Sequence, residues 1–221
     1  MNEVSFNLVK GDFKMARPKA PEKKELIRKA AINLISEEGF YNVTTDKIAE
    51  KAGVSVGTIY NYFKNKEDII SYIFQVEQKK LKLIFNRVKK KKLSVPEKFK
   101  ILIDKYFKYV FYNKKLARLI HIETHRPSVE ITREIFDFIY EIRQHLKELI
   151  REGVEENSLY AEYNPDMIVN IIMGLSYTTV FFAYENPEQI EYLYKKGPED
   201  IYQMLSKGII KKETNEQECD Y

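Results

Sequence analysis

The most informative part of the sequence is Thr44–Lys66, in which residues 56–63 have the pattern of a short helix. In a helix over 56–63, Ile59 and Phe63 stand four residues apart, share one face and point inward. The opposite face carries Gly57, Thr58 and Asn61, flanked by Tyr60 and Tyr62, and all of these residues are small or can form hydrogen bonds. Such a surface suits the base edges of a DNA major groove better than a protein core.

A second short helix and a tight turn are expected to position this one. A hydroxyl at Thr44 or Thr45 can cap the free backbone N–H groups at the start of a helix that ends near Ala52. Gly53 can supply the left-handed residue that ends this helix, and Ser55 can cap the next one. Two helices joined in this way predict a DNA-binding helix-turn-helix.

The rest of the chain has the apolar periodicity of helices, so the expected fold class is all-α. Helices are expected over about 21–38, 66–91, 96–112, 116–123, 127–153, 166–184 and 198–211. The helix over 166–184 is apolar on nearly every side and must be covered on every side. One flank can face the domain core and the other a second subunit.

Two stretches resemble the DNA-binding region of TetR-family transcriptional regulators. They read Gly53-Val54-Ser55-x-Gly57-Thr58-Ile59-Tyr60-x-Tyr62-Phe63-x-Asn65-Lys66-Glu67 and, upstream, Ile27-x-x-Ala30-Ala31-x-x-Leu34-Ile35-x-x-x-Gly39-Phe40. The remainder agrees with the family only in length and helical character. The resemblance implies an N-terminal three-helix DNA-binding domain and a larger C-terminal helical domain for effector binding and dimerisation.

Where residues match the family motif, the resemblance implies a role for each on duplex DNA. Phosphate contacts, which fix register without reading sequence, are implied for Thr45, Ser55, Tyr60, Tyr62 and Lys66. Base contacts are implied for Val56, Gly57, Thr58 and Asn61. The alternative for the two tyrosines is that they pack on the helix over 21–38.

The resemblance also implies a homodimer, in which the last two long helices of each chain form a four-helix bundle. A two-fold dimer reads two half-sites about 34–36 Å apart, or a multiple of that spacing, so the expected operator is palindromic.

Family members keep a ligand cavity between the C-terminal helices. The residues expected at its border are Tyr106, His121, His125, Phe138 and Tyr177. Residues 120–151 and 63–69 also resemble acyl-CoA-responsive regulators of fatty-acid degradation within the family, which makes a hydrophobic effector, such as an acyl-CoA, the expectation. Two alternatives stay open: the histidines are satisfied interior residues, or the protein is a ligand-independent nucleoid or cell-division factor of the same fold.

The pair His121 and His125 also raises the question of an enzyme. Two histidines four residues apart share a helical face, as in some zinc hydrolases, but there a glutamate directly follows the first histidine. Here Glu123 comes two residues later and is turned away. The sequence shows no phosphate-binding glycine loop or nucleophile elbow either. No catalytic activity, metal or cofactor is therefore expected.

Length and composition suit a small domain and a larger one, since the chain has 221 residues, 44% of them hydrophobic. The expected boundaries are 15–66 for the DNA-binding domain, 67–211 for the effector domain and 212–221 for a polar tail. Residues 1–14 are either disordered or precede a second start at Met15.

Charge and cysteine content agree with a DNA-binding protein of the cytoplasm. The net charge of +4 arises from residues 1–66, which hold twelve Lys or Arg and eight Asp or Glu, whereas residues 67–221 hold twenty-five of each. The single cysteine, Cys219, excludes a disulfide framework within one chain. No apolar run reaches the length of about 18 residues that a membrane span needs, and no signal peptide is evident. A soluble, cytoplasmic protein without a membrane partner is expected.

Overall fold

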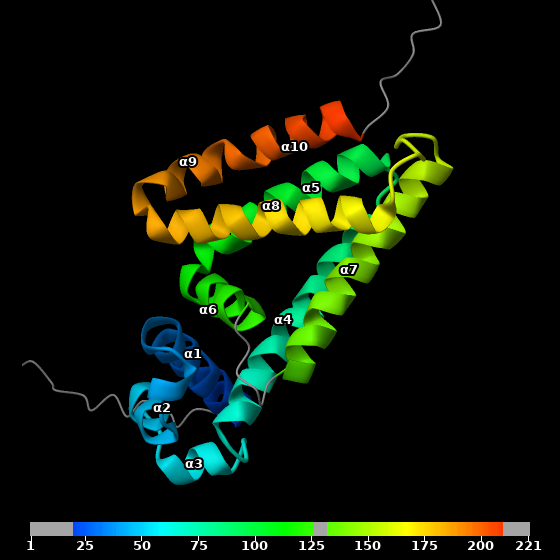
Figure 1. The fold of residues 1–221 in the computed structure, drawn as a ribbon. Helices are drawn as coiled ribbons and strands as arrows, with labels where there is room; N and C mark the ends of the chain where they lie inside the picture. Colours follow the sequence, from blue (N-terminus) through cyan, green and yellow to red (C-terminus); the bar gives the residue numbers. More distant parts are fainter. Residues whose placement is uncertain (1–19, 126–131, 210–221) are drawn as a thin grey trace, which may run out of the picture.

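A computed structural model describes residues 20–125 and 132–209, which form ten α-helices (Figure 1). In chain order these are α1 (Ala20–Glu38), α2 (Thr45–Ala52), α3 (Val56–Tyr60), α4 (Lys66–Lys89), α5 (Val95–Tyr112), α6 (Lys114–His125), α7 (Thr132–Glu155), α8 (Pro165–Glu185), α9 (Ile190–Lys195) and α10 (Gly197–Gly208). Two 3-10 turns, Phe40–Asn42 and Pro187–Gln189, follow α1 and α8. The predicted all-α fold is confirmed.

The helix starts follow the capping residues that the sequence offers. The Asn65 side chain accepts a hydrogen bond from the backbone N–H of Asp68 and so starts α4. At the start of α5, Glu97 accepts from both the backbone N–H and the hydroxyl of Ser94. These bonds lower the pKa of the Glu97 carboxyl. Asn164 caps α8, with Pro165 as its first residue.

Two helix predictions differ from the structure, and one helix was not predicted. The helix expected over 56–63 ends at Tyr60, because the carbonyl of Ile59 accepts from both Tyr62 and Phe63 and the chain then becomes extended at Asn65. The helix α9 was not predicted, since six residues are too few for a periodic pattern. The last helix starts at Gly197 and ends at Gly208, and the end expected at Lys211 lies outside the described residues. The expected start of α7, near Pro127, lies outside the described residues.

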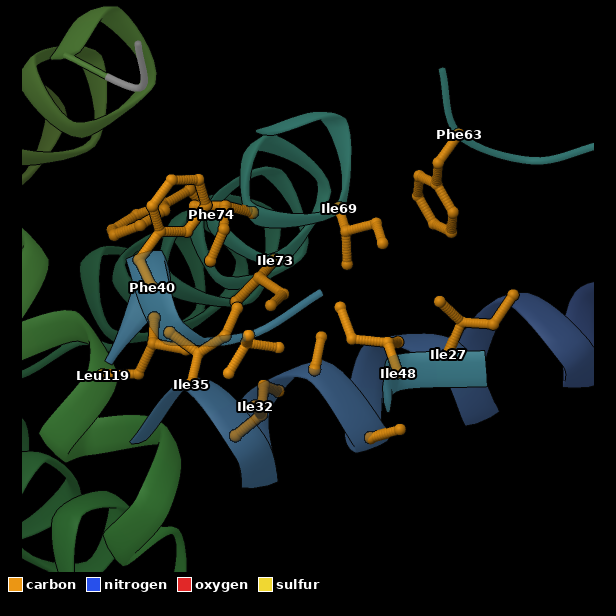
Figure 2. Packing of buried hydrophobic residues seen from close by; sticks show 14 of the residues in the cluster. Ile27, Ile32, Ile35, Phe40, Ile48, Phe63, Ile69, Ile73, Phe74 and Leu119 are labelled. Atoms are coloured by element: carbon orange, nitrogen blue, oxygen red, sulfur yellow. The ribbon is translucent and has the colours of Figure 1, made fainter. Parts of the chain in front are cut away.

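The largest core cluster joins the first three helices to the rest of the molecule. In Figure 2, Ile27, Ile48 and Phe63 lie around Ile69 of α4, and Phe40 lies beside Phe74 of the same helix. The same cluster includes residues of the later helices, namely Leu116, Leu119, Ile135 and Phe138. The packing is therefore continuous across the domain boundary expected at Lys66.

The long helices α4 and α7 lie side by side and connect α1–α3 to the opposite end of the molecule (Figure 1). Ring contacts hold the pair together, with centroid distances of 5.6 Å for Phe74–Phe138 and 4.8 Å for Phe85–His145. At the far end, α8 and α10 lie close to α5 (Figure 1). Close packing of α10 on α5 requires a glycine at 197, because a Cβ there would lie 2.7 Å from the Phe107 ring.

Candidate nucleic-acid interface and effector region

The helix-turn-helix forms with the caps that the sequence suggests. The hydroxyl of Thr44 accepts from the N–H of Lys47, and Ser55 accepts in the same way from Thr58. Gly53 adopts the left-handed conformation, with φ 66° and ψ 34°, which favours glycine over residues with a Cβ. These three positions fix the angle at which α3 follows α2.

The inner side of α3 belongs to the core, and its outer side is open. Ile59 and Phe63 are buried, as predicted, whereas Gly57, Tyr60 and Asn61 are exposed. A Cβ on Gly57 would meet only the Ser55 hydroxyl, at 3.9 Å, so this part of the helix leaves room for a partner to approach.

The other predicted contact residues are less accessible. Val56 and Tyr62 are half-buried and pack against the core, so part of each side chain has a structural role. The Thr58 hydroxyl lies 2.9 Å from the Ser55 hydroxyl, which orients both groups at the start of α3.

Two exposed hydroxyls meet across the helix-turn-helix. Thr45, at the start of α2, and Tyr60, at the end of α3, have their oxygens 3.4 Å apart. Tyr60 is 55% exposed, which contradicts the alternative that it packs on α1. Two hydroxyls beside a helix N-terminus are a favourable place for a phosphate.

Lys66 forms hydrogen bonds within the protein that were not predicted from the sequence. Its ammonium donates to the carbonyls of Phe40 (2.6 Å) and Val43 (2.8 Å) and lies 4.0 Å from the centroid of the Phe40 ring. An ammonium has three N–H donors, so one remains for a phosphate. Lys66 thus ties the start of α4 to the α1–α2 connection.

Three of the five predicted effector residues come together between α6 and α8. The Tyr177 ring stacks on His121 with centroids 4.2 Å apart and on His125 at 3.4 Å. Phe181 extends the stack at 5.7 Å from His121. Partial burial, with a smaller effect of His125, lowers the pKa of His121 to about 4, so this imidazole is neutral at neutral pH.

The other two predicted residues lie elsewhere. Phe138 is buried in the largest core cluster, where its ring contacts Phe74 of α4. Tyr106 is half-buried, and its hydroxyl donates to the backbone carbonyl of Ser176 on α8 at a distance of 3.0 Å. A small pocket between α4, α5 and α7 includes none of the five; its lining is Phe85, Asn86, Val88, Lys89, Leu102, His145, Glu148, Leu149 and Glu152.

The sequence analysis did not identify a stripe of aromatic and basic side chains on α7. Phe136 and Tyr140 are exposed and lie on the same side of the helix as Arg143 and Lys147. These two cations contact α8, where Arg143 donates to Asn170 (2.8 Å), and both pair with Asp166. The spacing 136, 140, 143 and 147 is the signal that could have identified this stripe.

No helix within the described residues is long and apolar enough to cross a membrane. Over the same residues, no group of three or more His, Cys, Asp or Glu side chains is placed to hold a metal ion.

A short, capped helix with one buried and one exposed side, set by a tight turn against a second helix, defines a helix-turn-helix DNA-binding protein. The family model described as bacterial regulatory proteins, tetR family, matches residues 27–73, and that of the tetracyclin repressor-like C-terminal domain matches residues 92–180. The chain belongs to the TetR family of transcriptional regulators. It is therefore a DNA-binding regulator and not an enzyme.

Several relatives match most of the chain. The fatty acid metabolism regulator protein of Bacillus subtilis is 27% identical over 203 residues, which cover 90% of this chain and 100% of the relative. The fatty acid degradation regulator FadR of Bacillus halodurans superposes with a TM-score of 0.77, at 29% identity over 87% of this chain and 98% of the other. FadR of Bacillus subtilis in complex with stearoyl-CoA gives a TM-score of 0.73 at 26% identity, covering 82% and 96% of the two chains.

Proposed function

We propose that the protein is a homodimeric repressor that binds a palindromic operator in the cytoplasm and leaves it when a long-chain acyl-CoA binds the C-terminal domain. The observation that carries this proposal is similarity along nearly the whole chain to fatty acid regulators, one of them solved with stearoyl-CoA. The similarity includes the C-terminal domain, where the effector would bind.

On the operator, the exposed side of α3 enters the major groove. Gly57 lets the backbone approach the bases, Asn61 hydrogen-bonds a base edge, and Val56 and Thr58 complete the contact. Phosphates on either side are held by Thr45, Ser55, Tyr60 and Tyr62, with the free N–H of Lys66 as a further donor. The 3.4 Å separation of the Thr45 and Tyr60 hydroxyls supports a shared phosphate.

The dimer interface is the outer stripe of α8. Exposed residues recur along it at helical spacing, namely Met167, Ile171, Gly174, Thr178 and Phe182. Met204 of α10 is also exposed. Exposed apolar side chains in a continuous stripe favour a protein partner, and Gly174 allows the two helices to approach closely.

The acyl chain lies beside a different side of α8, the one that faces α6 and α7. Tyr177 and Phe181 belong to this side, and Phe136 and Tyr140 stand on the side of α7 that carries its contacts to α8. Arg143 and Lys147 oppose the single carboxylate of Asp166, so the region holds more positive than negative charge. Aromatic surface next to cations suits an apolar chain that ends in phosphates.

The test begins with an operator selected from random duplexes by repeated binding to the protein. Sedimentation should give a dimer, and operator affinity should fall steeply as salt rises. Stearoyl-CoA should then release the operator, while stearate, which lacks the phosphates, should release it less. Selected duplexes without two-fold symmetry would contradict the dimeric operator, and release by none of a series of acyl-CoA chain lengths would contradict the effector.

A further inference from the structure

A buried carboxylate connects the DNA-binding domain to the effector domain. Glu77 of α4 is 4% exposed and contacts Arg28 of α1, which is 6% exposed. Arg28 Nη1 donates to Glu77 Oε1 at a distance of 3.1 Å, and Lys80 Nζ donates to the same oxygen at 2.9 Å. The hydroxyl of Tyr109, on α5, donates to Glu77 Oε2 at a distance of 2.8 Å. One side chain thus has partners on three helices.

The partners leave this carboxylate little freedom to move. Glu25 holds the Arg28 guanidinium with bonds of 2.7 and 2.8 Å from Nε and Nη2, and these bonds raise the pKa of Arg28. Removing one partner from a buried ion pair is costly, because the charge left behind is neither hydrated nor paired. A shift of α5 relative to α1 must therefore break a contact of Glu77 or carry α1 along.

A second tyrosine links α5 to the effector region. Tyr106 stands three residues before Tyr109, so the two lie on neighbouring parts of the helix surface. Its hydroxyl donates to the carbonyl of Ser176 on α8, and the next residue, Tyr177, carries the stack with the histidines of α6. Hydrogen bonds therefore connect α8 to α5 and α5 to α4 and α1.

We propose that Glu77 is the positioning residue through which the effector domain controls the DNA-binding domain. A displacement of α8 by the effector moves α5 through Tyr106, and Tyr109 passes the movement to Glu77 and Arg28. The two hydroxyls act in series, and α1 changes its angle when Tyr109 moves Glu77. This inference rests on the effector response proposed above.

The variant Tyr109→Phe tests the link because it removes only a hydroxyl and keeps the ring. The measurement is the ratio of operator Kd with and without stearoyl-CoA. We expect this ratio to fall at least about fivefold, the lower end of typical coupling between sites. The control Tyr112→Phe removes an exposed hydroxyl from the same helix, which meets the Tyr194 hydroxyl at 3.1 Å, and should keep the wild-type ratio. A wild-type ratio in Tyr109→Phe overturns the proposal.

A double-mutant cycle with Tyr106→Phe tests the series connection. If both hydroxyls transmit one movement, the double variant loses no more of the ratio than the more severe single variant. Losses that add as independent effects would show that the two contacts work separately and would overturn the series.

A distance measurement separates this proposal from the effector proposal. Spin labels at Lys51→Cys on α2 and Lys105→Cys on α5, in a Cys219→Ser background and diluted with unlabelled chain, report the angle between the domains without effector. Tyr109→Phe should shift or broaden the distance distribution, while Tyr112→Phe should not. If stearoyl-CoA fails to release the wild-type protein, the effector proposal alone fails. An unchanged distribution in Tyr109→Phe would then overturn the role of Glu77.

Discussion

The side-chain hydroxyls of Thr45 and Tyr60 lie 3.4 Å apart, although one residue begins α2 and the other ends α3. Because Tyr60 is exposed and Thr45 is half-buried, the contact adds little to the core and instead places two hydroxyls together beside a helix N-terminus. Both helices of the helix-turn-helix therefore contribute to one candidate phosphate site.

Tyr60→Phe should weaken operator binding without destabilising the fold. A hydrogen bond to a charged group contributes about 1.5–3 kcal/mol, so operator Kd should rise about tenfold or more. The loss should be similar for operator and random duplexes, because a phosphate contact does not read sequence. Fluorescence anisotropy with both duplexes measures it, and Tyr41→Phe, at another exposed tyrosine, serves as the control. A loss confined to the operator would mean that Tyr60 reads a base.

Gly57→Val should abolish operator binding while the protein still folds. The added Cβ meets nothing inside the protein closer than 3.9 Å, but a branched side chain on this surface would hold α3 away from the bases. Lys105→Val, at an exposed position of α5, controls for the cost of a β-branched residue in a helix. Normal operator affinity of Gly57→Val, with a circular dichroism melt like that of the control, would place Gly57 away from the DNA.

Lys66→Ala and Lys64→Ala should differ in their effect on stability. Lys66 donates to two carbonyls, and although the Phe40 carbonyl also accepts from the Val43 N–H, the loss of Lys66 removes both bonds to a charged donor. We therefore expect a decrease of about 1–3 kcal/mol in the free energy of unfolding. The ammonium of the exposed Lys64 donates to no carbonyl within the described residues, and its replacement should leave stability nearly unchanged. Urea denaturation compares the two. If Lys66→Ala is as stable as Lys64→Ala, the carbonyl bonds add nothing to the fold.

The caps and the core stripes could be predicted from the sequence because they depend on neighbouring residues. Thr44, Gly53 and Ser55 each act within a few positions of their place in the chain. The burial of Ile59 and Phe63 was also predictable from their spacing of four residues, although α3 ends before Phe63.

Contacts between distant helices were not predictable in the same way. Phe138 has the type and period of a cavity residue, but only the packing of α7 on α4 shows that it faces Phe74. A glutamate such as Glu77 in an amphipathic helix suggests a solvated side, and only the approach of α1 and α5 buries it. The sequence around Lys66 likewise gives no indication that its ammonium contacts the carbonyls of Phe40 and Val43, more than twenty residues earlier in the chain.

Stability should fall as the pH is lowered from about 6.5 to about 4 because of His121. Its pKa is about 4 in the folded protein and 6.5 ordinarily, so the unfolded chain binds more protons within this window. His121→Phe keeps a ring for the stack on Tyr177 but removes the titration. Urea denaturation at pH 6.5 and pH 4.5 should show a smaller loss in the variant than in the wild type. Equal losses would mean that the burial of His121 does not affect its protonation.

Ile171→Glu should convert the dimer to a monomer and thereby abolish high-affinity operator binding. Ile171 is 53% exposed in the middle of the outer stripe of α8, and two copies of the new carboxylate would face each other near the two-fold axis without partners. Leu83→Glu is the matched control, because Leu83 is 55% exposed on α4, outside this stripe. Sedimentation should give a monomer for Ile171→Glu and a dimer for Leu83→Glu. A dimeric Ile171→Glu protein would exclude this side of α8 as the interface.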